Sequence, residues 1–226
     1  MEALGLDSLR AGGLLLIDKP VGPSSARVVG VIKRLLHASK VGHGGTLDPF
    51  ASGLLPILVG RDFTRTADTL LAGDKAYRLT IRFGSRTDTG DLTGKVVAIG
   101  PGPLPTRDHL IASLRAFEGT IEQAPPAYSA LKVRGKPMYW YARRGQTVEK
   151  APRSVVIHRI TLVEQLALDA VLDVECSKGT YMRTLAEDVG RMLGCEAHLV
   201  ALRRTAVGPY RVDDAIPLWR IEQEAS

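Results

Sequence analysis

A glycine-rich loop that leads into an aspartate is the first feature of the sequence that could carry chemistry. Residues 42–49 read Gly-His-Gly-Gly-Thr-Leu-Asp-Pro. Glycines let a backbone approach a ligand such as a phosphate closely, and the Asp48 carboxylate at the end of the loop is well placed to face a cleft. The loop has neither the Gly-Lys-Ser/Thr ending of a Walker loop nor the Gly-x-Gly-x-x-Gly spacing of a dinucleotide site.

The same residues also have a purely structural interpretation. An aspartate at an N-cap, followed by a proline at the first helical position, is a common way for a helix to begin. Asp48-Pro49 therefore predicts a tight turn that opens a helix. The two interpretations are compatible, because a carboxylate between a loop and a helix can still line a cleft.

Arg183 is a second candidate, because the residues around it predict a helix from about 181 to 193 and place it in the first turn. A cation at this end of a helix opposes the helix dipole, at a cost of a few tenths of a kcal/mol. We therefore expect a buried carboxylate or a phosphate to hold Arg183. The alternative is a solvated arginine on the surface.

The stretch 123–153 differs in composition from the rest of the chain. It carries four aromatic rings and seven basic side chains, with Glu149 as its one acidic residue. Bases of single-stranded RNA stack on aromatic rings while Lys and Arg bind the phosphates. The composition therefore favours contact with single-stranded or loop RNA, and the alternative is an exposed, solvated loop.

Other kinds of site find no support in the sequence. The five histidines and two cysteines show no metal-ligand spacing. No Gly-x-Ser-x-Gly elbow marks a serine nucleophile. We expect neither a metal nor a cofactor.

Composition places the chain among globular proteins. It has 226 residues, 45% of them hydrophobic, and a net charge of +6, which weakly suggests a polyanionic partner. We expect a single domain over residues 1–226. The sequence lacks the roughly 20 consecutive apolar residues of a membrane span and the features of a signal peptide at its start, so we expect a cytoplasmic protein.

The elements that must position these residues are predicted from hydrophobic periodicity. Residues 77–83 alternate strictly between apolar and polar side chains, as a half-buried strand does. Further strands are predicted at 14–17, 95–99, 155–163, 166–176 and 203–212. Helices are predicted from Ser24 or Ser25 to about 36, from Thr106 to about 117, over 181–193 and, briefly, at 218–221. Neighbouring strands and interspersed helices favour an α+β fold with a mixed, largely antiparallel sheet flanked by helices.

Several tracts, in order and with matching spacing, resemble the TruB family of bacterial tRNA pseudouridine-55 synthases. The resemblance covers roughly residues 14–219. One departure lies between residues 60 and 74, where the chain reads Gly-Arg-Asp-Phe-Thr-Arg in place of the usual Gly-Glu-Ala-Thr-Lys and is one residue longer. The matching tracts are residues 17–20 with 24–25, 41–49, 52–56, 75–77, 86–91, 123–130, 176–183 and 202–204.

The resemblance implies roles for residues at the matching positions. Asp48 would be the nucleophile or base that acts at the ribose, and Arg183 the cation that keeps it ionised. Tyr77 would stack on the target base and remove its C5 proton. The substrate-binding residues so implied are His43, which would fill the space left by a flipped-out uridine, Tyr181 and Leu202 in the base pocket, Lys19, Asp91, and the phosphate-contacting Lys132, Arg134, Arg143 and Arg144.

The resemblance also implies the pseudouridine synthase catalytic fold, with 123–153 as a flexible insertion that clamps RNA. The partner would be the T stem-loop of tRNA, bound by a monomer with no obligate protein partner. The length leaves no room for a full C-terminal PUA domain. Two alternatives stay open, a non-catalytic RNA-binding module on the same scaffold and a phosphate-binding transferase that would need nucleotide and Mg²⁺. Relatives guided by small RNAs are a third neighbour, although the short chain favours the stand-alone bacterial kind.

Overall fold

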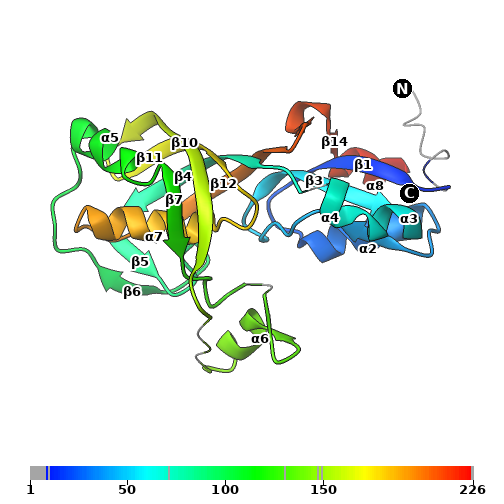
Figure 1. Ribbon diagram of the computed structural model, residues 1–226, viewed down its shortest axis with the longest axis horizontal. Helices are drawn as coiled ribbons and strands as arrows, with labels where there is room; N and C mark the ends of the chain where they lie inside the picture. The colour runs from blue at the N-terminus through cyan, green and yellow to red at the C-terminus, as the bar shows by residue number, and fades with distance from the viewer. Residues whose placement is uncertain are drawn as a thin grey trace. The chain divides into compact units, whose positions relative to one another are not determined.

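The computed structural model describes Leu9 and residues 11–70, 72–129, 131–146, 148 and 150–224. These residues form two compact units, one from Met1–Ala76 with Arg203–Ser226 and the other from Tyr77–Leu202. The chain passes between the units inside two strands, β4 (Lys75–Phe83) and β12 (Ala197–Val207). We call them the terminal unit and the central unit, and Figure 1 shows their elements.

The terminal unit is built on strands in the order β14-β1-β3-β12, with β2 paired to β3 and β13 paired to β12. β1 and β3 are antiparallel, whereas β14 runs parallel to β1 and β3 parallel to β12. Its elements are β1 (Gly13–Lys19), α2 (Ser25–Leu35), β2 (Val41–His43), β3 (Ser52–Val59), α3 (Arg61–Arg65), α4 (Ala67–Leu70), β13 (Tyr210–Arg211), a 3-10 turn (Val212–Asp214), β14 (Ile216–Pro217) and α8 (Leu218–Glu224).

The core of the terminal unit follows from the patterning of its first elements. β1 buries every second residue, as a strand with one face on the core must. α2 begins at Ser24, whose hydroxyl accepts a hydrogen bond from the Arg27 amide, and it buries Val28 and Ile32. The expected strand at 14–17 and the helix after Ser24 are both confirmed.

The central unit has strands in the order β12-β4-β11-β10-β7. The β11–β10 and β10–β7 pairs are antiparallel. Figure 1 shows α5 and α7 beside these strands and α6 on a stretch of chain outside the sheet. Its other elements are β5 (Ser85–Thr87), β6 (Val96–Ile99), α5 (Arg107–Arg115), β7 (Gly119–Gln123), β8 (Lys132–Val133), β9 (Lys136–Pro137), α6 (Met138–Ala142), β10 (Arg153–Leu166), β11 (Asp169–Cys176) and α7 (Met182–Met192).

The fold class is the expected one, α+β with a mixed, largely antiparallel sheet and helices against it. The alternation over 77–83 is confirmed, because residues 77, 79, 81 and 83 are buried in β4. The predicted strands at 95–99, 155–163 and 166–176 and the helices after Thr106 and Tyr181 are present with shifts of one to three residues at most ends. The chain divides into two compact units. That these units together form one domain over residues 1–226 stays a prediction.

The helix predicted to begin at Asp48-Pro49 is wrong. The Ala51 amide donates to the Asp48 carbonyl at 3.1 Å, which closes a single turn. The chain then enters β3 at Ser52 and pairs along β1 as far as Gly13. Pairing with β1, β2 and β12 therefore outweighs the local helix-start signal.

The sequence predicts a last strand over 203–212. In the structure β12 begins six residues earlier, at Ala197, and ends at Val207, and β13 begins only at Tyr210. Long-range hydrogen bonds hold this earlier part. Nδ1 of the buried His198 lies 2.8 Å from the Ser85 carbonyl oxygen, and the Leu199 amide donates to the Gly90 carbonyl. Contacts of this kind leave no periodic signal in the sequence.

No helix within the described part of the chain is both long and apolar enough to span a membrane.

Gly53 is the residue at which β3 and β12 come too close for a side chain. Its φ is +101°, and a Cβ there would lie 2.3 Å from the Arg204 carbonyl oxygen and 2.7 Å from the Arg204 nitrogen. We expect Gly53→Ala to lower the free energy of unfolding by about 3 kcal/mol or more, through backbone strain and a clash with main chain. Urea denaturation measures this.

Gly30 in α2 provides the matched control. It is exposed, and a Cβ there would meet nothing within 4 Å. Gly30→Ala should stabilise the protein by up to about 1 kcal/mol, since alanine is the better helix former. Equal effects of the two substitutions would contradict the role given to Gly53.

Candidate active site

Asp48 lies half-buried at the end of the glycine-rich loop. Ser25, the first residue of α2, binds the backbone of Leu47, which precedes Asp48. The Ser25 hydroxyl donates to the Leu47 carbonyl and accepts from the Leu47 amide, both at 2.9 Å and both out of water. Ser25 is 2% exposed. This pair of hydrogen bonds ties the backbone next to Asp48 to the first turn of α2.

Lys19, at the end of β1, is fully buried in the terminal unit. Its ammonium donates to the carbonyls of Pro20 and Pro23, each at 2.9 Å. Burial lowers the pKa of Lys19 to about 8, the negative charge of Asp48 opposes that shift, and the positive charge of Arg204 adds to it. Lys19 therefore lies within electrostatic reach of Asp48.

Arg204 is the residue of this neighbourhood that sequence reasoning did not single out, although the matching tract 202–204 contains it. Its side chain is 1% exposed, and it donates to the carbonyls of Leu54 at 2.8 Å and of Gly45 at 3.1 Å. The second bond fixes the loop three residues before Asp48. Two buried cations, Lys19 and Arg204, thus lie in the neighbourhood of this loop, and the charge of Lys19 interacts with that of Asp48.

His43 lies in β2 at the other end of the same loop. Burial and the positive charge of Arg204 lower its pKa, so the imidazole is neutral at physiological pH. Its Nδ1 is buried and has no hydrogen-bond partner among the described residues. The structure thus places three of the predicted residues, His43, Asp48 and Lys19, in one unit around one loop.

Arg183 lies in the first turn of α7, as predicted, and it is 5% exposed. Its guanidinium donates to the carbonyls of Thr89 at 2.9 Å and Tyr128 at 2.8 Å. Nε lies 4.0 Å from a carboxylate oxygen of Asp91. A buried carboxylate, one of the two partners expected for this cation, thus lies at ion-pair distance. The alternative of a solvated arginine on the surface is wrong, because the side chain is buried.

Asp91 is itself fixed by a turn of threonines. Its carboxylate accepts from the Thr93 amide and hydroxyl, at 2.9 and 2.6 Å, and from the Thr89 hydroxyl at 3.0 Å. It is 5% exposed. Thr89 and Asp91 therefore form a rigid acceptor for Arg183.

The three predicted pocket residues of the central unit lie on different elements. Tyr77 is buried in β4, Leu202 is buried in β12, and Tyr181 is the residue that precedes α7. Two contacts with Tyr181 were not foreseen. The Gln123 side chain hydrogen-bonds the Tyr181 backbone, and the Arg153 guanidinium lies 4.6 Å from the centre of its ring.

The stretch 123–153, which we call the basic segment, contains the hairpin of β8 and β9 and the short helix α6. Its cations pack on its own aromatic rings. Arg144 lies 3.6 Å from the centre of the Trp140 ring, with Lys136 5.7 Å from the same ring, and Arg143 lies 5.5 Å from Tyr139. The four residues predicted to contact phosphate, Lys132, Arg134, Arg143 and Arg144, are all exposed.

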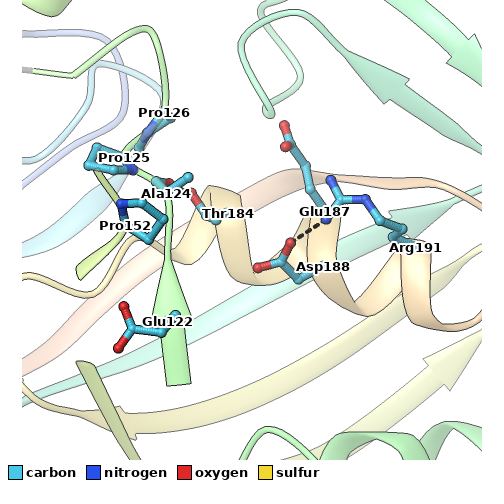
Figure 2. Close-up of a pocket in the computed structure, with 9 residues that line it drawn as sticks. All are labelled: Glu122, Ala124, Pro125, Pro126, Pro152, Thr184, Glu187, Asp188 and Arg191. Atoms are coloured by element: carbon cyan, nitrogen blue, oxygen red, sulfur yellow. Dashed lines mark hydrogen bonds and ion pairs between the residues drawn. The ribbon is translucent and has the colours of Figure 1, made fainter. Parts of the chain in front are cut away.

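A pocket of about 370 Å³ in the central unit contains none of the predicted site residues. Figure 2 shows it between one face of α7, with Thr184, Glu187, Asp188 and Arg191, and three prolines of the basic segment. Burial raises the pKa values of Glu187 and Asp188. Asp188 also pairs with Arg191 at 2.6 Å.

A metal centre finds no candidate ligands among the described residues, because they contain no group of three His, Cys, Asp or Glu side chains able to hold an ion.

Two family models match the chain and together cover most of it. One is described as TruB family pseudouridylate synthase (N terminal domain) and matches residues 33–182. The other is described as tRNA pseudouridylate synthase B C-terminal domain and matches residues 183–226.

Curated relatives and solved structures agree with these matches. The tRNA pseudouridine synthase B of Bordetella avium is 54% identical over 208 residues, 91% of this chain and 85% of its own. That of Cupriavidus metallidurans is 52% identical over 217 residues, 94% of this chain and 68% of its own. A chain from a crystal structure of a Cbf5-Nop10-Gar1 complex is 33% identical with a TM-score of 0.71, and the match covers 93% of this chain and 53% of that one. This chain thus spans about half the length of that solved relative.

We expect Ser25→Ala to loosen the loop at Leu47. It removes two buried hydrogen bonds and leaves the Leu47 amide and carbonyl unsatisfied, at a cost of about 2 kcal/mol. Hydrogen exchange at the Leu47 amide should speed up accordingly. Ser24→Ala is the matched control, because it removes the exposed cap of the same helix, costs about 1 kcal/mol, and leaves Leu47 protected. Unchanged protection of Leu47 in the Ser25 variant would contradict the assignment.

Proposed function

The chain belongs to the TruB family of pseudouridylate synthases and isomerises uridine to pseudouridine in tRNA, and we propose that it does so in the T-arm loop, at position 55, with Asp48 acting on the ribose. The observation that carries the proposal is the setting of this one carboxylate. It ends a loop tied down by Ser25 and Arg204, and it lies within electrostatic reach of the buried Lys19.

The isomerisation breaks the N1–C1′ bond of the uridine, turns the base and joins C5 to C1′, so that one C5 proton leaves and N1 gains one. The reaction is redox-neutral and consumes no second substrate. An ionised carboxylate can attack C1′ or remove a ribose proton, and both routes stay open for Asp48. The positive charge of Lys19, which interacts with Asp48, favours the ionised form that both routes need.

The remaining roles come from the resemblance. Tyr77 stacks on the target base and takes its C5 proton, Arg183 keeps Asp48 ionised, and Tyr181 and Leu202 line the base pocket. His43 fills the space that the flipped uridine leaves, at an unstacking cost of a few kcal/mol. The neutral, half-buried imidazole of His43 suits a group that stacks among bases.

Two predicted substrate contacts are better explained as positioning residues. Lys19 is fully buried and Asp91 is 5% exposed. Lys19 donates to backbone carbonyls, and Asp91 accepts from threonines and pairs with Arg183. These contacts support roles in shaping the loops around Asp48 and Arg183.

The proposal includes the location, the oligomeric state and the RNA contacts of the protein. The protein acts in the cytoplasm as a monomer without an obligate protein partner, and the exposed cations of the basic segment bind phosphates of the T arm.

Asp48→Asn should bind tRNA with nearly wild-type affinity and release no tritium from C5-labelled uridine. The amide keeps the shape of the side chain but can neither attack C1′ nor accept a ribose proton. The control is Asp62→Asn, which changes an exposed aspartate of α3 and should keep full activity. Measurable turnover by the Asp48 variant would refute its role, and a wild-type protein that binds T-arm RNA but converts none would favour the non-catalytic alternative.

Binding of tRNA should weaken steeply with salt, because phosphate contacts release counterions. Removing Arg143 and Arg144 together, as alanines, should lower the slope of log Kd against log salt by about 1 to 2. The control removes two exposed charges from α2, Lys33 and Arg34, and should leave the slope nearly unchanged. Equal slopes for the wild type and both double variants would contradict a phosphate-binding role for the basic segment.

A further inference from the structure

The two ends of the basic segment leave the sheet at a single point. Gln123 is the last residue of β7 and Arg153 the first of β10, and the two are paired directly across the strands. Gln123 is fully buried. The whole basic segment is therefore joined to the sheet through this one pair of residues.

Both residues of this pair contact Tyr181, the residue that precedes α7. The Tyr181 amide donates to Oε1 of Gln123 at 2.9 Å, and Nε2 of Gln123 donates back to the Tyr181 carbonyl at 3.3 Å. The first amides of a helix lack partners within it, and Tyr181 makes no cap with its own side chain. Gln123 thus supplies from another strand a hydrogen bond that this helix start needs.

Arg153 holds the same residue from the other end of the basic segment. Its guanidinium stacks on the Tyr181 ring at 4.6 Å and donates to the Gly179 carbonyl. Its Nε is buried without a hydrogen-bond partner among the described residues. The described contacts of this arginine are therefore with Tyr181 and Gly179 of its own chain.

Further contacts join the start of the basic segment to the first turn of α7. The Tyr128 carbonyl accepts from Arg183 at 2.8 Å, and the Ala124 carbonyl accepts from the Thr184 hydroxyl at 3.3 Å. Figure 2 shows Ala124, Pro125, Pro126 and Pro152 gathered beside Thr184. Prolines restrict the backbone at both ends of the segment, next to these contacts with α7.

We propose that Gln123 and Arg153 are positioning residues that couple RNA binding by the basic segment to the placement of Tyr181 and Arg183. When the segment closes on phosphates, Gln123 and Arg153 set the position of the Tyr181 ring and of the first turn of α7. The inference rests on the proposed function, in which Tyr181 lines the base pocket and Arg183 supports catalysis.

The first test replaces Arg153 by lysine, which keeps the charge but loses the planar stacking surface. We expect single-turnover conversion at saturating tRNA to fall about tenfold or more, while Kd changes by less than about threefold. Arg159→Lys is the matched control on the same strand, since Arg159 is exposed and pairs with Glu175, and it should change neither quantity. A weaker Kd with an unchanged saturating rate, equal losses in both, or no change in either would overturn the proposal.

The second test does not depend on activity. Gln123→Met removes both hydrogen bonds to Tyr181 with little change in volume, and thermal melting checks that the variant folds. In the wild type, binding of T-arm RNA should slow hydrogen exchange over residues 181–185, and in the variant this slowing should be lost although the RNA still binds. Equal protection in both proteins would overturn the coupling. A wild-type protein that binds RNA but forms no pseudouridine would instead count against the proposed function, and the exchange result would still decide this inference.

Discussion

Burial of cations is the constraint on which the candidate site depends. Lys19, Arg183 and Arg204 are at most 5% exposed, and each donates to two backbone carbonyls, of which all but that of Leu54 in β3 lie in loops or turns. A buried charge is tolerated only when such partners compensate for the lost water. Each cation therefore dictates the course of the loops around it, and those loops carry the candidate residues.

The loop that ends at Asp48 shows how this works. Arg204 holds it at Gly45 and Ser25 holds it at Leu47. The loop backbone that leads to Asp48 is therefore fixed at two points by residues far away in sequence. Lys19, which holds the loop after β1 at Pro20 and Pro23, also interacts with the charge of Asp48 and so favours the ionised carboxylate. Structure and electrostatics are thus supplied by the same side chain, which leaves little freedom to change one without the other.

Sequence reasoning succeeded where a local anomaly pointed to a distant partner. A cation in the first turn of a helix opposes the dipole, and that anomaly led us to expect either a buried carboxylate or a phosphate at Arg183. The structure places the buried carboxylate of Asp91 there. It failed at Asp48-Pro49, where a good local helix start is replaced by one turn and a strand, because β3 gains a full ladder with β1. It also passed over Gln123, Arg153 and Ser25, whose importance lies in contacts 20 to 60 residues away.

The sequence by itself determined the fold class, most strands and helices and the family, because periodicity, caps and motif spacing are local properties. It also named the candidates for chemistry, which stay predictions. The tertiary structure alone decided which side chains hold the loops, that Lys19 and Asp91 are buried among backbone groups, and that both ends of the basic segment meet at Tyr181. These depend on hydrogen bonds between segments that only the folded sheet brings together, and no pattern along the chain encodes their geometry.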